Sequence, residues 1–281
     1  MIYEKYEGSS SFVKIENIDE NNVYTGVGSK AFLSCKNVYE IELPETIREI
    51  GDWSFSHMKE LKKIVVPAND IIIGRDAFSD CKKLQEVVVY PDDSKNEGLP
   101  FLLASCLTVL GTYKLFNPKM ASESNEDWCD LYDEELIRFI NYQDDRGFQP
   151  FIVGWFNDEG EEEQLERYIN EMRRSKFRLC FLRLKYDMHI KENTKNILVN
   201  YIRNELGYMD DDNNSSWVNF RDELSDDLQY VKIASCNNLL SDAMKEELVT
   251  YINRRNGNPE TVAYLLSQNE DTKTIEELFE L

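Results

Sequence analysis

The sequence predicts an α/β solenoid with a short parallel sheet over residues 1–98, followed by an all-α region over residues 99–281. The solenoid is indicated by Gly28, Gly51 and Gly74, which lie 23 residues apart within a pattern that is written three times. The second part is indicated by a change from alternating apolar residues to the three- and four-residue spacing of amphipathic helices.

Each repeat ends in a short run, YEIEL, KKIVV or QEVVV, in which apolar residues alternate. Such alternation predicts one strand per repeat, with Ile41, Ile64 and Val87 directed inward. A single coil cannot bury its own apolar side, so stacked coils bury it jointly and all three are needed for stability. A period of about 20 to 29 residues is typical of leucine-rich repeats.

Beyond the period, each repeat contains a glycine, then Ala-Phe or Ser-Phe, a Cys or Met three residues later, and a proline after the strand. This motif resembles the BspA-like subclass of bacterial leucine-rich repeats over about residues 23–91. The pattern departs where Trp53 and Ser54 replace a small pair and where Tyr90 precedes Pro91, so the last coil is expected to be distorted. The resemblance implies a recognition surface and not a chemistry.

The polar, turn-rich stretch PDDSKNEG at residues 91–98 marks the predicted domain boundary. After it, the apolar run at residues 99–111 predicts a buried helix that begins near Pro100. A change in the phase of the apolar face near Ser175 predicts a bend or a new N-cap there. Apolar spacing predicts further helices over residues 131–142, 165–172, 177–184, 194–206 and 216–235.

The last part of the chain predicts a helical hairpin with a very short turn. Ser241 is expected to be an N-cap, Gly257 the left-handed residue after the helix, and Asn258 the next N-cap before Pro259. The segments KLFNPK, YDEELIRFI, DDRGFQP and RRSKFRLCFLRL resemble the uncharacterised helical domain that follows BspA-like repeats in some bacterial proteins. That resemblance implies no assigned activity.

The chain is strongly acidic, with 53 Asp and Glu residues against 32 Lys and Arg residues and a formal net charge of −21. Such a field repels phosphate backbones and anionic headgroups, so no nucleic-acid partner is predicted. The longest apolar run, residues 99–111, is shorter than the roughly 20 residues that span a bilayer. No membrane insertion is therefore predicted.

The compartment is predicted from the first residues and the cysteines. MIYEKYEGSSSF is too polar for a signal peptide, and the six cysteines are scattered without CxxC spacing. Cys35 and Cys81 share a repeat position but are two coils apart, about 10 Å, which is beyond disulfide reach. These features predict a cytoplasmic protein, whereas the resemblance to BspA-like repeats implies the cell surface as an alternative.

The outward strand positions contain the predicted binding site. The column that includes Lys63 alternates in charge sign, so adjacent coils are expected to pair opposite charges. The neighbouring column, Glu42, Val65 and Val88, leaves two β-branched residues facing water on the concave side. Either the helical region packs there, or a partner binds there, or the valines are simply exposed. We expect protein binding at Glu42, Lys63, Val65 and Val88.

The run RRSKFRLCFLRLK at residues 173–185 concentrates cations in an acidic chain. One interpretation is a docking site for an acidic partner or a phosphate group. The favoured interpretation is that these cations pair with acidic neighbours, such as GEEEQ at residues 160–164, and lay their stems over the core.

Two features of the sequence partly resemble metal sites. DDDNNS at residues 210–215 resembles the start of a calcium loop, but Ser215 replaces the required glycine and Arg221 replaces the final glutamate. His57 and His189 have no companion at ligand spacing. The sequence therefore predicts no metal site, no cofactor and no catalytic residue.

These observations favour a non-enzymatic protein–protein interaction module that uses the concave repeat face and the junction between the two domains. The expected partner is a protein or a peptide, and the sequence leaves its identity and the oligomeric state open. Two alternatives remain. One is a hydrolase or transferase with carboxylates of raised pKa in a cleft between the domains. The other is a repeat unit that serves only as a structural cap.

Overall fold

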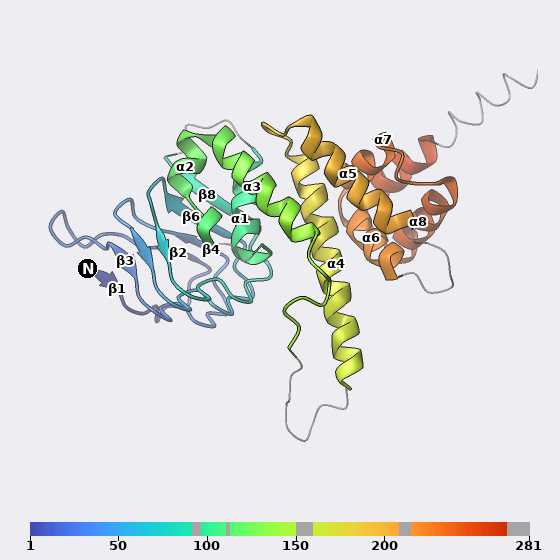
Figure 1. Cartoon of the computed structure of the whole chain (residues 1–281). Coiled ribbons are helices and arrows are strands. Elements are labelled where there is room, and N and C mark those ends of the chain that lie inside the picture. Colours follow the sequence, from blue (N-terminus) through green and yellow to red (C-terminus); the bar gives the residue numbers. More distant parts are fainter. Residues whose placement is uncertain (92–96, 111–112, 150–159, 208–214, 269–281) are drawn as a thin grey trace, which may run out of the picture. The chain divides into compact units, whose positions relative to one another are not determined.

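The structure is a computed structural model that describes residues 1–91, 97–110, 113–149, 160–207 and 215–268 (Figure 1). Contacts between residues divide the chain into two compact units. The first comprises Met1–Leu136 with Tyr186–Ile190, and the second comprises Ile137–Lys185 with Lys191–Leu281.

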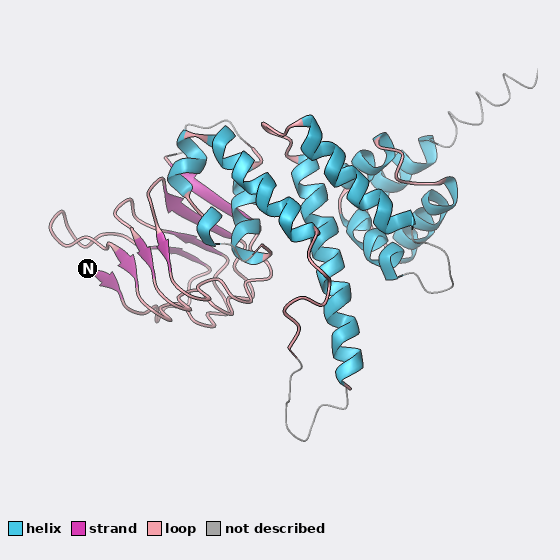
Figure 2. Ribbon diagram, viewed as in Figure 1, coloured by secondary structure: helices cyan, strands magenta, loops and turns pink. Residues whose placement is uncertain are grey.

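The first unit begins with a β-solenoid of about four turns, in which each turn contributes one strand to each of two parallel sheets (Figure 2). This confirms the predicted solenoid. One sheet has the order β1 (Ile2–Tyr3), β3 (Gly26–Val27), β5 (Glu49–Ile50) and β7 (Ile72–Ile73). The other has the order β2 (Phe12–Lys14), β4 (Glu40–Glu42), β6 (Lys63–Pro67) and β8 (Glu86–Tyr90).

The inward positions of the second sheet form the core of the solenoid. Ile41 is in register with Ile64, and Ile64 is in register with Val87. All three side chains are fully buried, as the alternating pattern predicts. The repeated glycines have a separate reason, because a Cβ on Gly51 would lie 2.7 Å from the main-chain nitrogen of Ser29. Adjacent coils therefore approach too closely there for a side chain.

An aromatic ladder runs through the coils. The rings of Phe32 and Phe55 are stacked with centroids 5.3 Å apart, and those of Phe55 and Phe78 are 5.1 Å apart. Tyr3 and Tyr6 stack on Phe32 from the first turn, at 5.6 and 5.1 Å. The repeated motif predicts three coils and one sheet, so this first turn and the second sheet are additions to the prediction. Tyrosines occupy its ladder positions without the glycine and Ala-Phe signature.

The far end of the solenoid is covered by helix α1 (Leu99–Thr108), which packs against β8. Its side chains Leu102, Leu103 and Cys106 are fully buried, which confirms a buried helix in the apolar run. Because α1 completes the solenoid core, the first compact unit extends past the predicted boundary at residue 98 as far as Leu136. The elements that follow are η1 (Tyr113–Leu115), α2 (Pro118–Glu123) and α3 (Asn125–Ile140).

The second unit is helical, as predicted. It comprises the last turn of α3 and helices α4 (Glu161–Lys185), α5 (Glu192–Gly207), α6 (Ser215–Asp226), α7 (Leu228–Cys236) and α8 (Asp242–Arg254), with further helical residues at 259–268. Its core includes Phe177, Phe181 and Phe220, whose side chains are fully buried. The single helix predicted over 216–235 is wrong, because the Asp227 side chain accepts the Gln229 N–H at 2.8 Å and starts a new helix.

No new N-cap forms near Ser175, because α4 runs unbroken from Glu161 to Lys185. Its two halves turn different faces to different neighbours. In the first half, the Tyr168 hydroxyl donates to the Arg146 carbonyl at 2.6 Å. In the second half, buried residues such as Phe181 pack against α6 and α7. The one-residue shift in apolar spacing near Ser175 therefore arises because the two halves of α4 bury different faces.

The C-terminal helical hairpin forms with the predicted N-caps. Ser241 Oγ accepts the Met244 N–H at 3.3 Å, and Asn258 Oδ1 accepts the Glu260 N–H at 2.9 Å. The predicted left-handed residue is wrong by one position: Asn256 has φ of +51°, and Gly257 donates its N–H to the Ile252 carbonyl at 2.9 Å. Asparagine tolerates this conformation because its side chain is short and polar.

Candidate interaction surfaces

The outward side chains of the β2–β4–β6–β8 sheet form one surface, which we call the strand face. Strand register and period-two alternation place its members in adjacent rows. They are Phe12, Lys14, Glu40, Glu42, Lys63, Val65, Glu86, Val88 and Tyr90.

The structure brings the four predicted binding residues together on this face. Glu42 is in register with Val65, and Val65 with Val88, so these three form one row across β4, β6 and β8. Lys63 lies in the neighbouring row, in register with Glu40. All of them are half-buried.

Two ion pairs organise the charges of the strand face. Lys14 Nζ lies 2.7 Å from Glu42 Oε1, and Lys63 Nζ lies 3.0 Å from Glu40 Oε1. The hydrogen bond from Lys14 to Glu42 raises the pKa of that lysine, which therefore stays charged. Exposed cross-strand pairs of this kind add little to stability, so they mainly fix the positions of the charged side chains on the strand face.

Two exposed aromatic residues on the strand face were not predicted. Phe12 on β2 is 46% exposed and Tyr90 on β8 is 54% exposed, so an aromatic side chain lies on each outer strand of this sheet. Pro67, the outward residue beside Tyr90 in the next strand, is not exposed: it is buried at the end of β6, against which helix α2 packs. The alternation that identifies Val65 and Val88 also points Tyr90 outward, so this residue continues β8 rather than interrupting the repeat.

A second surface is formed by the stacked turns at residues 28–36, 51–59 and 74–82, which we call the turn face. It contains a shallow groove of about 300 Å³. The groove is lined by Lys30, Leu33, Ser34, Trp53, Ser56 and His57. His57 is exposed and its Nδ1 lies 3.0 Å from Asp80 Oδ2, an interaction that lowers the pKa of Asp80.

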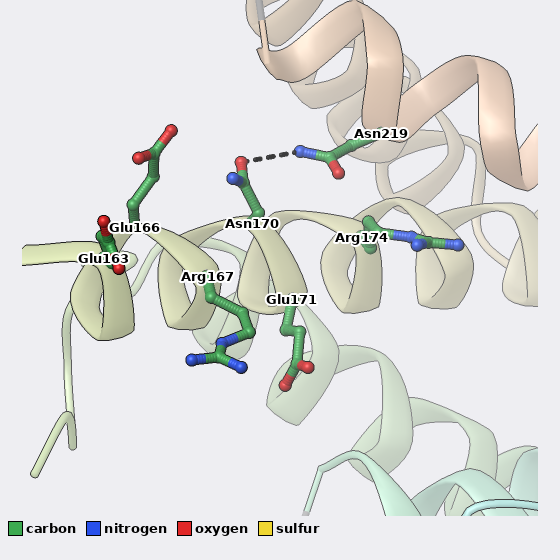
Figure 3. Close-up of a pocket in the computed structure, with 7 residues that line it drawn as sticks. All are labelled: Glu163, Glu166, Arg167, Asn170, Glu171, Arg174 and Asn219. Atoms are coloured by element: carbon green, nitrogen blue, oxygen red, sulfur yellow. Dashed lines mark hydrogen bonds between the residues drawn. The ribbon is translucent and has the colours of Figure 1, made fainter. Parts of the chain in front are cut away.

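A third candidate is a depression of about 380 Å³ between α4 and α6 (Figure 3). It is lined by Glu163, Glu166, Arg167, Asn170, Glu171, Arg174 and Asn219. Asn219 donates to Asn170 at 3.1 Å across it. Figure 3 shows the side chains of Glu166 and Glu171 pointing to opposite sides of α4, so these carboxylates do not converge on one point as a general acid–base pair requires.

The cations in the basic run of α4 form ion pairs with acidic residues, as the favoured interpretation predicts. Their partners are not the predicted residues 160–164. Lys176 Nζ lies 2.7 Å from Asp144, Arg178 lies 2.7 Å from Glu223, and Lys185 lies 2.6 Å from Asp227. The predicted partners at residues 160–164 precede the basic run on the same chain segment. At a rise of about 1.5 Å per residue they lie roughly 15 Å or more from most of it.

Around Asp144, several ionisable groups of the second unit lie close together. Burial by itself would raise the pKa of Asp144, but hydrogen bonds from Lys176 and Arg173 lower it below its ordinary value. The pKa of Glu205 on α5 is raised, first by burial and then by Asp144, against a lowering effect of Arg173 and Lys176. Burial also raises the pKa of Tyr201.

Replacing Glu205 with glutamine is expected to raise the free energy of unfolding at neutral pH. The raised pKa means that the folded state binds the proton more tightly than the unfolded chain, whose glutamate titrates near 4.5. The charged carboxylate therefore costs stability once the pH exceeds that value, and glutamine removes this cost. Urea unfolding should show a gain that is full above the raised folded pKa, shrinks as the pH falls from there towards 4.5, and is absent below 4.5. An equal gain from exposed Glu246→Gln, or a gain independent of pH, would contradict the assignment.

The predictions that the chain has no metal site and no membrane-spanning helix can be compared only with the described residues. Asp210–Asn214, which contain most of the calcium-loop resemblance, lie outside the described residues. Within the described ranges, no group of three or more His, Cys, Asp and Glu side chains is arranged to hold a metal ion. In the same ranges, no helix combines the length and apolar character needed to cross a bilayer.

Comparison with known proteins identifies the solenoid. Residues 8–97 match the BspA type leucine-rich repeat region, in six copies. The repeat region of this chain is therefore of the BspA type, which confirms the resemblance and extends it into the first turn. No curated protein and no solved structure matches the chain. Leucine-rich repeats of this kind indicate protein–protein interaction and are typically non-enzymatic.

Proposed function

We propose that this chain is a non-enzymatic interaction module that binds a protein or peptide through the strand face. The observation behind the proposal is the aligned register that sets Val65 and Val88 side by side on β6 and β8, with exposed Tyr90 two residues after Val88 and exposed Phe12 on the opposite outer strand, β2. Aromatic and aliphatic side chains surrounded by oriented polar groups are the usual composition of an interface centre.

The size of the strand face limits the partner. Four strands at a spacing of about 4.8 Å extend roughly 15 Å across the sheet. Its longest strands have 5 residues and are about 17 Å long, so the face covers on the order of 250 Å², well below the roughly 800 Å² per partner of a standard protein interface. A single extended segment or one helix of a partner fits such a surface, and its affinity is expected to be modest.

The variant Val65→Glu/Val88→Glu tests the proposal. Both substitutions replace half-buried apolar side chains with carboxylates in the middle of the strand face, so binding should be lost. Tagged wild type and variant, confirmed as folded, would be used for affinity capture from the protein's own cells, followed by mass spectrometry. A partner retained near stoichiometry by wild type and absent with the variant is the expected result.

A control variant with the same added charge tests whether the loss of binding is specific to the strand face. Ile18 and Ile72 are also exposed apolar residues of the solenoid, and both lie outside the strand face. The variant Ile18→Glu/Ile72→Glu has the same added charge and should retain the partner. If both variants lose it equally, the effect arises from charge; if both retain it, the strand face is not the binding site.

For the compartment we propose the cytoplasm, with the cell surface as the alternative given by the repeat type. The proposal is supported by Cys81, which is buried, donates its thiol to the Phe55 carbonyl at 3.0 Å, and has a pKa raised to about 12 by burial. A packed, protonated thiol of this kind is a core group rather than half of a disulfide. Cell fractionation decides between the two compartments, and recovery from the envelope would refute the proposal.

A further inference from the structure

The turn face has one feature that the strand-face function does not use: Trp53 lies between two cations. Arg75 is placed over the indole ring with its guanidinium carbon 4.4 Å from the ring centroid, and Lys30 Nζ is 5.5 Å from the same centroid. These three residues come from three successive coils and meet because the coils stack in register. Cation–π attraction at such distances favours the positions of the Lys30 and Arg75 side chains over the indole ring.

The backbone around Trp53 is held in an uncommon conformation. Lys30, Ser34, Trp53 and His57 line the groove, and all four have φ between +53° and +62°. Left-handed backbone is unfavourable for a non-glycine residue and persists only where surrounding contacts hold it. Hydrogen bonds between coils hold it, since Lys30 donates its N–H to the Asp52 carbonyl and Trp53 donates to the Arg75 carbonyl, both at 3.0 Å. The groove is therefore preformed.

The turn face is also locally basic in an acidic chain. Its three turns contain five Lys and Arg residues against three Asp residues, whereas the whole chain has 32 against 53. Two of the aspartates are engaged within the turn face: Asp80 with His57, and Asp52 with the main-chain N–H of Arg75. Within the described ranges, neither Lys30 nor Arg75 forms an ion pair with a carboxylate.

We infer that this groove is a second docking site, which binds an acidic segment of a partner protein. Lys30 in the groove and Arg75 beside it, over the Trp53 ring, bind its carboxylates, and Leu33, which is 40% exposed and lines the groove, contacts an apolar side chain of the segment. Stacking on the indole leaves the edge of the Arg75 guanidinium available for a bidentate contact. Because the groove and both cations are already positioned, binding loses little conformational entropy.

The experiment is a fluorescence-anisotropy titration of the full chain with a short labelled peptide of glutamate and aspartate residues around one central leucine. Saturable binding that weakens as salt concentration rises is expected. Lys30→Glu/Arg75→Glu should weaken it by about tenfold or more, because two attractive contacts become repulsive. The control Lys62→Glu/Lys114→Glu has the same change in net charge at exposed sites outside the groove and should bind as wild type does.

Several results would overturn the assignment. They are the absence of saturable binding, equal weakening in both variants, or equal binding of a peptide in which lysine replaces every acidic residue. If the charge-reversed variant fails to fold by circular dichroism, Lys30→Gln/Arg75→Gln takes its place. A wild-type dimer in sedimentation that dissociates only in the groove variant would show that a second copy occupies the groove, which refutes a separate partner. Strand-face capture with Val65→Glu/Val88→Glu is independent of all these outcomes.

Discussion

Replacing Phe55 with alanine is expected to lower the free energy of unfolding by about 3–5 kcal/mol. Phe55 is fully buried in the middle of the aromatic ladder, stacked on Phe32 at 5.3 Å and on Phe78 at 5.1 Å. Its loss leaves a cavity between two coils that cannot close, because hydrogen bonds fix the separation of the coils. Both ring contacts are lost together with the buried apolar area.

Urea unfolding followed by circular dichroism measures this loss. Tyr39→Ala is the control, because Tyr39 is an exposed aromatic residue of the same solenoid. Its replacement should cost well under about 1 kcal/mol. If Phe55→Ala is no more destabilising than Tyr39→Ala, the ladder does not hold the coils together.

Replacing Asp144 with alanine is expected to destabilise the second unit by about 3–5 kcal/mol. Asp144 lies 2.7 Å from both Lys176 Nζ and Arg173 Nε, and the Lys176 side chain is only 3% exposed. Without the carboxylate, the lysine retains its hydrogen bond to the Tyr142 carbonyl but is a buried charge with no counter-charge from Asp144. That uncompensated charge is the source of the expected loss.

Two further variants separate this cause from loss of packing. Asp144→Ala/Lys176→Met removes both members of the pair and should recover part of the stability, because no charge is then left behind. Asp145→Ala changes the adjacent, exposed aspartate and should be nearly neutral. A double variant that is less stable than Asp144→Ala would show that the ion pair is not the source of the effect.

The pH dependence of the same pair has a definite sign. The pKa of Asp144 is lowered in the folded state, so its stabilising contribution is present above the ordinary value of 3.8 and is lost as the pH falls through the folded pKa. Wild type should therefore lose stability on acidification, and Asp144→Asn should lose less over that range. The pKa of Glu205 is shifted in the opposite direction, so its charged form lowers stability as the pH rises. The Asp144→Asn and Glu205→Gln variants measure the two effects separately.

The solenoid was largely predictable because its geometry repeats the period of the sequence. Once residues 23 apart occupy equivalent places, alternation fixes which side of each strand faces inward, and Ile41, Ile64 and Val87 are buried accordingly. The first turn was not predictable from the same motif. Tyr3 and Tyr6 reproduce the stacking of the ladder without its sequence signature, and the pairing of β1 with β3 and of β2 with β4 shows the turn in the structure.

The candidate sites were predictable to the extent that they follow local pattern. Glu42, Val65 and Val88 are related by the period, whereas Phe12 joins the strand face only through the unrecognised first turn. The contacts of Lys30 and Arg75 with Trp53 cross between coils and involve side chains of different types. One signal was available, since Trp53 lies one period after Lys30.

The ion pairs of the helical region could not be read from the sequence at all. Glu223 and Asp227 lie more than forty residues after their partners Arg178 and Lys185, and they reach them only through the packing of α6 against α4 and the start of α7. Proximity in the sequence therefore predicts residues 160–164 as partners, whereas the structure pairs the run with Glu223 and Asp227. Tertiary packing decides such partners, and one sequence does not contain that information in local form.

The inter-coil hydrogen bonds make the solenoid a scaffold of adjustable length. Each coil meets its predecessor and its successor through the same contacts, as the N–H groups of Lys30 and Trp53 illustrate. Duplicating residues 51–73 would insert one complete coil without changing the first turn or the cover formed by α1. Each inserted coil would widen the strand face by about 4.8 Å. The reach of recognition in this architecture thus changes in whole-coil steps, independently of the helical region that follows.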